Sequence, residues 1–221
     1  MNLNYLRQQR PVTEDLRRSI REDLPELADI RDADLRAKCV EAWAYSLSYS
    51  SFGRIRDLPP EGNPGQSVLI RGTQCDHLRG VTHLAVKIAD EFAETRSEVI
   101  INRDVVIAGG LCHDVGKPYE FDPENRARWA RDPSVSGLPS LRHSVFGAHV
   151  CLTVGLPEEI AHIALGHSME GPFIGLSAEC MIVRQADHLW WTIAGALGLL
   201  KPESIGHMGT MLQPRQPLAK Q

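Results

Sequence analysis

The sequence predicts an all-α protein, a compact bundle of helices with a helical extension at its N-terminal end. Two observations favour this class. Apolar residues recur at helical spacing, three to four positions apart, through most of the chain. Strand signals are weak, because the two most strand-like stretches, residues 68–70 and 99–101, are each only three residues long.

Length and charge narrow the function classes. A chain of 221 residues can bury a substantial core, so it needs neither a disulfide nor a metal ion simply to fold. Its formal net charge is −4, and Lys and Arg do not gather into a run. The sequence therefore predicts no positively charged surface of the kind that holds a nucleic-acid backbone, and we do not expect a protein that coats nucleic acid.

Cysteine usage and apolar stretches predict a cytoplasmic protein. The five cysteines are an odd number, widely spaced, which favours buried thiols over a secreted disulfide framework. Residues 1–14 contain no apolar signal-peptide segment. The longest apolar stretch, residues 189–200, is too short to span a bilayer, so we expect a buried helix and no membrane association.

Two helices and a long connection are expected in the first third of the chain. Thr13 can cap a helix that runs to about residue 24, and Asp32 can cap the next one. Residues 51–72 then break the pattern with several prolines and glycines. A connection of this length either covers a site as a lid or links two domains, and the sequence leaves both open.

Five longer helices are expected after this connection, interrupted by a short helix and a loop within residues 121–141. Their predicted ranges are residues 74–94, 103–115, 142–154, 157–167 and 178–200. The domain organisation that follows is an N-terminal helical extension with a long loop (residues 1–72), a helical domain (73–200) and a C-terminal tail (201–221).

Polar residues interrupt the apolar stripes of four of these helices. At about 100° per residue, one residue in each helix shares the face of its apolar neighbours. These residues are His77, His143, His167 and Asp187. Three other histidines on the same helices, His83, His149 and His162, point away from the stripes, so we expect them not to be ligands.

An adjacent His113-Asp114 pair follows the apolar run of residues 105–111. Each of these polar residues alone would more often be a hydrogen-bonded core group than a ligand. Burying all of them by coincidence is improbable, because each buried ionisable group costs several kcal/mol unless it is paired or coordinated. A shared metal site accounts for them together, since helical bundles build such sites from inward-pointing His and carboxylate side chains.

The order and context of these residues resemble the HD-domain superfamily of metal-dependent phosphohydrolases. The similar segments are His77-Leu78-Arg79-Gly80-Val81, residues 110–118 (GLCHDVGKP), residues 155–160 followed by His167, and Ala186-Asp187-His188. The resemblance covers residues 74–190, about half of the chain, and does not include the first 70 residues. The Gly-Tyr-Pro extension of the cyclic-dinucleotide branch is missing after His143, which disfavours that branch.

The resemblance implies a dinuclear metal site. His77, His113, Asp114 and Asp187 would hold one ion, and Asp114 would bridge to a second ion held by His143 and His167. Mixed imidazole and carboxylate ligands suit two divalent transition-metal ions, with Fe or Mn favoured and Zn, Co or Ni also compatible.

The implied activity is hydrolysis of a small phosphorylated metabolite or nucleotide by metal-activated water. Asp114 would act as the bridging catalytic carboxylate, and Lys117 would neutralise a phosphate or a leaving oxygen. A solvated lysine at a helix end is the alternative for Lys117. Arg142 and Arg79 are the candidate phosphate-binding residues, although each could instead form a salt bridge.

Two other functions stay open. The ligand set also resembles the mixed-valence diiron oxygenases of the same superfamily. A nucleotide-sensing module with a structural metal is weaker, because structural sites are usually closed and four-coordinate. The apolar helix within residues 189–200 could form core or the seam of a homodimer, so a homodimer is a further expectation. Trp190 and Trp191 are expected to pack in the core rather than to stack on a base.

Overall fold

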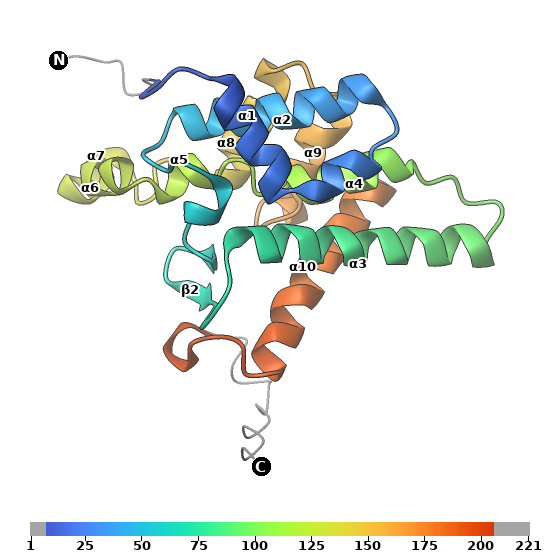
Figure 1. Ribbon diagram of the computed structural model, residues 1–221. Helices are drawn as coiled ribbons and strands as arrows, with labels where there is room; N and C mark the ends of the chain where they lie inside the picture. The colour runs from blue at the N-terminus through green and yellow to red at the C-terminus, as the bar shows by residue number, and fades with distance from the viewer. Residues whose placement is uncertain (1–7, 206–221) are drawn as a thin grey trace, which may run out of the picture.

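Helix α4 (Arg103–Cys112) lies at the centre of the computed structural model, which describes residues 8–205 (Figure 1). Its residues from Val105 to Cys112 are all buried. Helices α2 (Ala33–Ser48), α3 (Gln74–Thr95), α9 (Glu158–Gly166) and α10 (Ala178–Ala196) pack against it. Because α4 is covered by its neighbours, its sequence is apolar all round rather than amphipathic.

The other elements surround this centre, with α1 on α2, and α8 between α5 and α9. Their bounds are α1 (Glu14–Asp23), α5 (Lys117–Phe121), α6 (Pro123–Arg131), α7 (Pro133–Ser136) and α8 (His143–Thr153), with short 3-10 turns η1 (Pro25–Asp29), η2 (Ile55–Asp57), η3 (Gly171–Phe173) and η4 (Pro202–Ser204). The all-α class is confirmed, and each helix expected from the sequence has a counterpart.

The N-terminal helices begin at the predicted caps and join the central core. The Thr13 hydroxyl accepts a hydrogen bond from the Leu16 N–H, and the Asp32 carboxylate accepts from the first turn of α2. The Trp43 indole N–H on α2 donates to the carbonyl of Leu111 on α4 at 2.9 Å. Both helices therefore pack on the core shared with the predicted helical domain, and the domain boundary between residues 72 and 73 stays a prediction.

Two helices end earlier than the sequence suggested. Helix α4 stops at Cys112 instead of residue 115, because the following turn closes with i→i−3 hydrogen bonds, from the Val115 N–H to the Cys112 carbonyl and from the Lys117 N–H to the Asp114 carbonyl. Helix α10 stops at Ala196 instead of residue 200. Gly198 takes the left-handed conformation there (φ +70°), and the Leu199 N–H bonds back to the Ala194 carbonyl.

The expectation that no strands form is wrong within the long connection. Strands β1 (Glu61–Asn63) and β2 (Gln66–Val68) pair antiparallel around a Pro64-Gly65 turn, where Gly65 supplies the positive φ (+77°). The segment after α10 extends this pairing, since Leu69 is bridged to Leu200. Figure 1 shows the hairpin beside that segment, far from it in sequence. Strands of three residues give too short an alternation for sequence analysis to detect.

Helix α10 is buried on one face only. Trp191 and Ala194 are buried, whereas Leu189, Ile193 and Leu197 are each about half exposed. The prediction of a buried helix is therefore correct for one face of α10 and wrong for the other, and the homodimer stays a prediction.

All five cysteines are buried free thiols. Within residues 8–205, no helix combines the length and apolarity needed to cross a membrane. Residues 206–221 of the predicted tail lie outside the described part of the chain.

Candidate metal centre

The six residues predicted to bind metal come together in the middle of the bundle. His77 lies on α3, His143 begins α8, and Asp187 lies on α10. His113 and Asp114 occupy the turn after α4, and His167 follows α9 directly. All six are at most 9% exposed, which for His77, His143, His167 and Asp187 agrees with the helical phases calculated from the sequence.

The first group consists of His77, His113 and Asp187 together with one oxygen of Asp114. The Nε2 atoms of His77 and His113 are 3.2 Å apart, and Nε2 of His77 lies 3.3 Å from Oδ1 of Asp187. Oδ2 of Asp114 is 3.4 Å from His77 Nε2 and 3.3 Å from His113 Nε2. Oδ1 of Asp187 is buried without a hydrogen-bond partner, so this carboxylate oxygen is free to bind a cation.

The second group consists of His143 and His167 on the other side of Asp114. Their Nε2 atoms are 3.3 Å apart, and each lies 3.5 Å from Oδ1 of Asp114. The two oxygens of one carboxylate thus face two different groups of imidazoles.

Hydrogen bonds at the far side of the rings fix the tautomers of this second group. His167 Nδ1 donates to the Ala164 carbonyl at 2.9 Å, and His143 Nδ1 donates to the Glu120 carboxylate. In the neutral imidazoles, both Nε2 atoms therefore present lone pairs, which cannot hydrogen-bond to each other. A cation between them would satisfy both lone pairs, so the residues present fit a divalent transition-metal ion.

Both aspartates are held in their charged form. Burial raises the pKa of Asp187, but the neighbouring His77 ring opposes this effect and brings the pKa below its usual value. Burial likewise raises the pKa of Asp114, whereas the Lys117 ammonium and His113 hold it well below its usual range. Ionised carboxylates and neutral imidazoles are the protonation states that metal ligands require.

Lys117 is buried against this centre rather than solvated, with only 1% of its surface exposed. Its ammonium lies 2.8 Å from Oδ2 of Asp114 and donates to the Glu61 carbonyl of strand β1 at 2.7 Å. Gly116 allows this placement, because a Cβ there would lie 2.0 Å from the His143 carbonyl oxygen. The alternative of a solvated lysine at a helix end is wrong for this residue.

Sequence analysis missed two buried partners of the ligands. The Gln74 amide donates to Oδ2 of Asp114 at 2.8 Å. Glu120, fully buried on α5, accepts from both the backbone N–H and the Nδ1 of His143. Gln74 carries no motif signal, and the five-residue helix α5 is too short for a periodicity that would have marked Glu120 as inward-facing.

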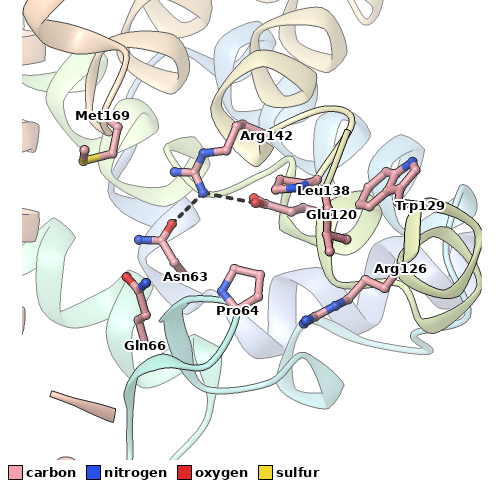
Figure 2. Close-up of a pocket in the computed structure, with 10 residues that line it drawn as sticks. Asn63, Pro64, Gln66, Glu120, Arg126, Trp129, Leu138, Arg142 and Met169 are labelled. Atoms are coloured by element: carbon pink, nitrogen blue, oxygen red, sulfur yellow. Dashed lines mark hydrogen bonds and ion pairs between the residues drawn. The ribbon is translucent and has the colours of Figure 1, made fainter. Parts of the chain in front are cut away.

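The two arginines expected to bind phosphate lie in different places. Arg142 lies beside the centre, where its guanidinium donates to Glu120 and Asn63 (Figure 2). It also donates to the Ser168 hydroxyl. Arg79 is not brought to the centre, because its guanidinium pairs with Glu26 at 2.7 Å.

The remaining histidines of these helices lie outside the cluster, as their helical phases indicated. His83 contacts Glu26 and His149 is exposed, whereas the His162 ring accepts from the Ser177 N–H. Among residues 8–205, the groups whose side chains converge closely enough to hold a metal are drawn from His77, His113, Asp114, His167 and Asp187.

A cavity of about 600 Å³ opens onto the cluster. Asp114, His143, His167 and Asp187 line its floor together with Lys117. Its walls come from the β-hairpin (Gly62, Asn63, Gln66 and Ser67), from Ser168 and Met169, and from the α10 residues His188, Trp191 and Thr192, with Ile205 at one side. The long connection therefore borders the site, which favours the lid interpretation over a linker.

Trp191 is more than core packing, since it both lines the cavity and stacks on His77 with ring centroids 4.5 Å apart. Its indole fixes the orientation of this ring. The hairpin approaches the same indole, because a Cβ at Gly62 would lie 3.5 Å from it.

Comparison with known proteins assigns the chain to a family. The family model described as HD domain matches residues 75–191, more than half of the chain and all six clustered residues. A dihydroneopterin 2',3'-cyclic phosphate phosphodiesterase of Methanocaldococcus jannaschii is 44% identical over 50 residues, 23% of this chain. This chain thus matches about a fifth (20%) of that relative's length, and no solved structure matches significantly. On its family match and its converging His and Asp residues, the chain belongs to the HD domain family.

Proposed function

We propose that this protein is a phosphohydrolase that works with two divalent transition-metal ions. One observation carries the proposal: the two oxygens of Asp114 face two separate groups of imidazoles, at 3.3–3.4 Å on one side and 3.5 Å on the other. A single ion held by His77, His113 and Asp187 would leave the facing Nε2 lone pairs of His143 and His167 without a partner. His77, His113, Asp114 and Asp187 would hold one ion, and Asp114, His143 and His167 the other, with Fe or Mn favoured for these ligands and Zn, Co or Ni compatible.

When bound, such a metal pair makes hydroxide available near neutral pH and balances charge on a phosphoryl group. Asp114 would fix the distance between the two groups of histidines, because one of its oxygens faces each group. Lys117 has three N–H donors, of which two are directed at Asp114 and the Glu61 carbonyl. The third can bind a phosphoryl oxygen as negative charge develops in the transition state.

The proposed substrate is a small phosphorylated metabolite or nucleotide. The cavity of about 600 Å³ has the size of a small-molecule site. The M. jannaschii relative is named for a cyclic phosphate of a pterin compound, which is a small phosphoester. Arg142 borders the site and would hold Glu120, and through it His143, in place. Arg79 pairs with Glu26 instead, so we assign it no role in substrate binding.

Metal content and turnover test the proposal together. The purified protein is loaded with Mn²⁺ or Fe²⁺ with and without oxygen, its metal is quantified, and phosphate release is followed on phosphomonoesters, nucleotides and cyclic phosphates. We expect about two ions per chain and metal-dependent phosphate release. Oxygen-dependent turnover without phosphate release would replace the hydrolase with the oxygenase, and metal binding without turnover would favour the sensing module.

Single substitutions locate each ion. His143→Ala and His167→Ala should each lower the content toward one ion per chain, and Asp114→Ala should lose both metal and activity, more than either His change. His149→Ala and His162→Ala, on the same two helices, are the matched controls and should keep two ions. If the parent protein binds only one ion per chain, and His143→Ala and His167→Ala still bind that ion, the second metal ion does not exist.

A further inference from the structure

A second cavity, of about 430 Å³, adjoins the one above the metal centre. Asn63, Gln66 and Met169 line both cavities, so the two share a wall formed by the hairpin and the segment after His167. The rest of the second cavity is built from Pro64, Glu120, Arg126, Trp129, Leu138, Pro139 and Arg142. None of the six clustered His and Asp residues lines it, so the cavity is not itself part of the metal centre.

Arg126 of helix α6 brings a positive charge to this cavity without a counter-charge. Within residues 8–205 its guanidinium has no hydrogen bond or ion pair. Figure 2 shows its side chain reaching toward the hairpin at Pro64. A guanidinium in this position can bind a carboxylate or phosphate with two parallel hydrogen bonds.

The other charges of the cavity are already balanced. Arg142 pairs with Glu120 at 3.1 Å and with Glu170 at 3.4 Å, and Glu120 also accepts from His143. The remaining polar side chains are the amides of Asn63 and Gln66 and the indole of Trp129, whose N–H is buried without a hydrogen-bond partner, and the other walls are apolar. The cavity therefore offers one uncommitted cation, amide donors and apolar surface, which suits an anionic group on an organic body.

We propose that this second cavity binds an anionic group carried by the leaving group of the phosphoester, with Arg126 as the residue that recognises it. The proposal rests on the proposed function, because the scissile phosphoryl group would occupy the metal-site cavity. It narrows the substrate class to phosphoesters with a second anion, a carboxylate or another phosphate, on the leaving group. A simple monoester with a neutral leaving group would fill only the first cavity.

Aryl phosphates that differ only in the second group test this preference. The manganese-loaded protein is assayed with phenyl phosphate and with 4-carboxyphenyl and 4-(carboxymethyl)phenyl phosphate. The neutral carbamoyl partner of each acid matches its size. In the carboxymethyl pair, the methylene group also insulates the leaving group from the electronic effect of the second group. 1,4-Phenylene bisphosphate separates a preference for phosphate from one for carboxylate. We expect kcat/KM for at least one of the two carboxylated phosphates to exceed that of its carbamoyl partner about tenfold, chiefly through KM.

Substitution of Arg126 should remove this preference. Arg126 is exposed in the free protein, so its guanidinium is accessible to a ligand. We expect Arg126→Ala to lower the ratio of acid to carbamoyl kcat/KM about tenfold, the size of one charge-assisted hydrogen bond. Arg126→Lys keeps the charge and should retain part of the ratio. Arg131→Ala, on the same helix but lining neither cavity, is the matched control and should keep the parent ratio.

A binding measurement separates failure of the subsite from failure of the hydrolase. Titration calorimetry with benzylphosphonate and (4-carboxybenzyl)phosphonate, which cannot be hydrolysed, should show tighter binding of the carboxylated compound by the parent than by Arg126→Ala. Hydrolysis of phenyl phosphate with no preference for a second anion would overturn the subsite and leave the proposed function standing. Arg126-dependent binding without any hydrolysis would support the subsite and overturn the hydrolase. Equal or absent binding of both phosphonates would overturn the subsite.

Discussion

Glu120 connects the metal centre to the cavity beside it. Its carboxylate accepts from His143 on one side and from Arg142 on the other, in a fully buried position. A carboxylate behind a metal-binding histidine fixes the tautomer of the ring and makes its free nitrogen more basic. The second histidine pair is thus oriented by a residue that no sequence motif marked.

Replacing this carboxylate should weaken metal binding at the second group. We expect Glu120→Gln, which keeps the shape but loses the charge, to lower the affinity of the more weakly bound ion about 10- to 100-fold. Competition with a chelator measures the two affinities separately. Glu124→Gln, an exposed residue one helix further on, is the control and should match the parent. Unchanged affinity in Glu120→Gln would show that the histidine needs no buried partner.

The protonation of His143 should make the metal-free protein sensitive to acid. Burial lowers the pKa of His143 more than Glu120 raises it, so the folded state disfavours the charged ring. The unfolded chain binds this proton near the ordinary pKa of 6.5, and therefore stability is complete above pH 6.5 and falls as the pH drops below it.

Thermal melts of the metal-free protein between pH 8 and pH 5 test this dependence. His143→Gln removes the titrating ring and should flatten the decline of Tm below pH 6.5. Glu120 adds a second loss at lower pH, because burial raises its pKa but the His143 hydrogen bond brings it below the usual 4.5. Parallel curves for the parent and His143→Gln would mean that this ring does not control acid stability.

At the scale of elements, the contact between α5 and α8 places Lys117 and Glu120 in the site. Gly116 permits the contact, since a Cβ there would lie 2.0 Å from the His143 carbonyl oxygen and 2.6 Å from the Gly147 nitrogen. These are backbone atoms, which cannot rotate away.

Gly116→Ala should therefore force α5 away from α8. We expect a loss of about 1–3 kcal/mol in the free energy of unfolding, typical of overpacking, together with weaker metal binding. Gly175→Ala is the control, because nothing lies within 4 Å of its added Cβ and its φ is not positive. Urea unfolding and metal titration of both variants check the prediction, and equal stability of the two would contradict it.

Helical periodicity predicted most of the elements and the ligand faces of α3, α8, α9 and α10. It works there because each of these helices has an apolar stripe on which one polar residue stands out. Helical periodicity did not predict short elements or contacts between segments that are distant in the sequence. Glu120 lies on five residues of helix, and the hairpin is completed by the segment after α10. Arg79 was placed by its nearness to His77 in sequence, but it points to η1 instead.

At the scale of the whole molecule, the proposed metal ligands join segments that are distant in the chain. His77, on α3, and Asp187, on α10, are 110 residues apart and lie within 3.3 Å of each other. Ions that bind only the folded arrangement stabilise it by mass action, because the unfolded chain does not hold these residues together.

Metal removal should therefore lower the stability of the entire bundle. We expect Mn²⁺ at about 100 times its Kd to add about 2.7 kcal/mol to the free energy of unfolding, and a chelator to reverse this gain. Calorimetric melts with and without Mn²⁺ measure it. His162→Ala should keep the metal-dependent rise in Tm, and Asp114→Ala should lose it. A rise that persists in Asp114→Ala would place the stabilising ion elsewhere.

The bridge between Leu69 and Leu200 has a consequence for the order in which the molecule assembles on the ribosome. The hairpin forms a wall of both cavities, yet its pairing partner is synthesised 131 residues later. The ligand-bearing helices up to α9 can associate while the chain is still growing, whereas the hairpin is fixed by this bridge only after α10 has emerged. The walls of both cavities are thus completed last in biosynthesis, after most of the His and Asp cluster.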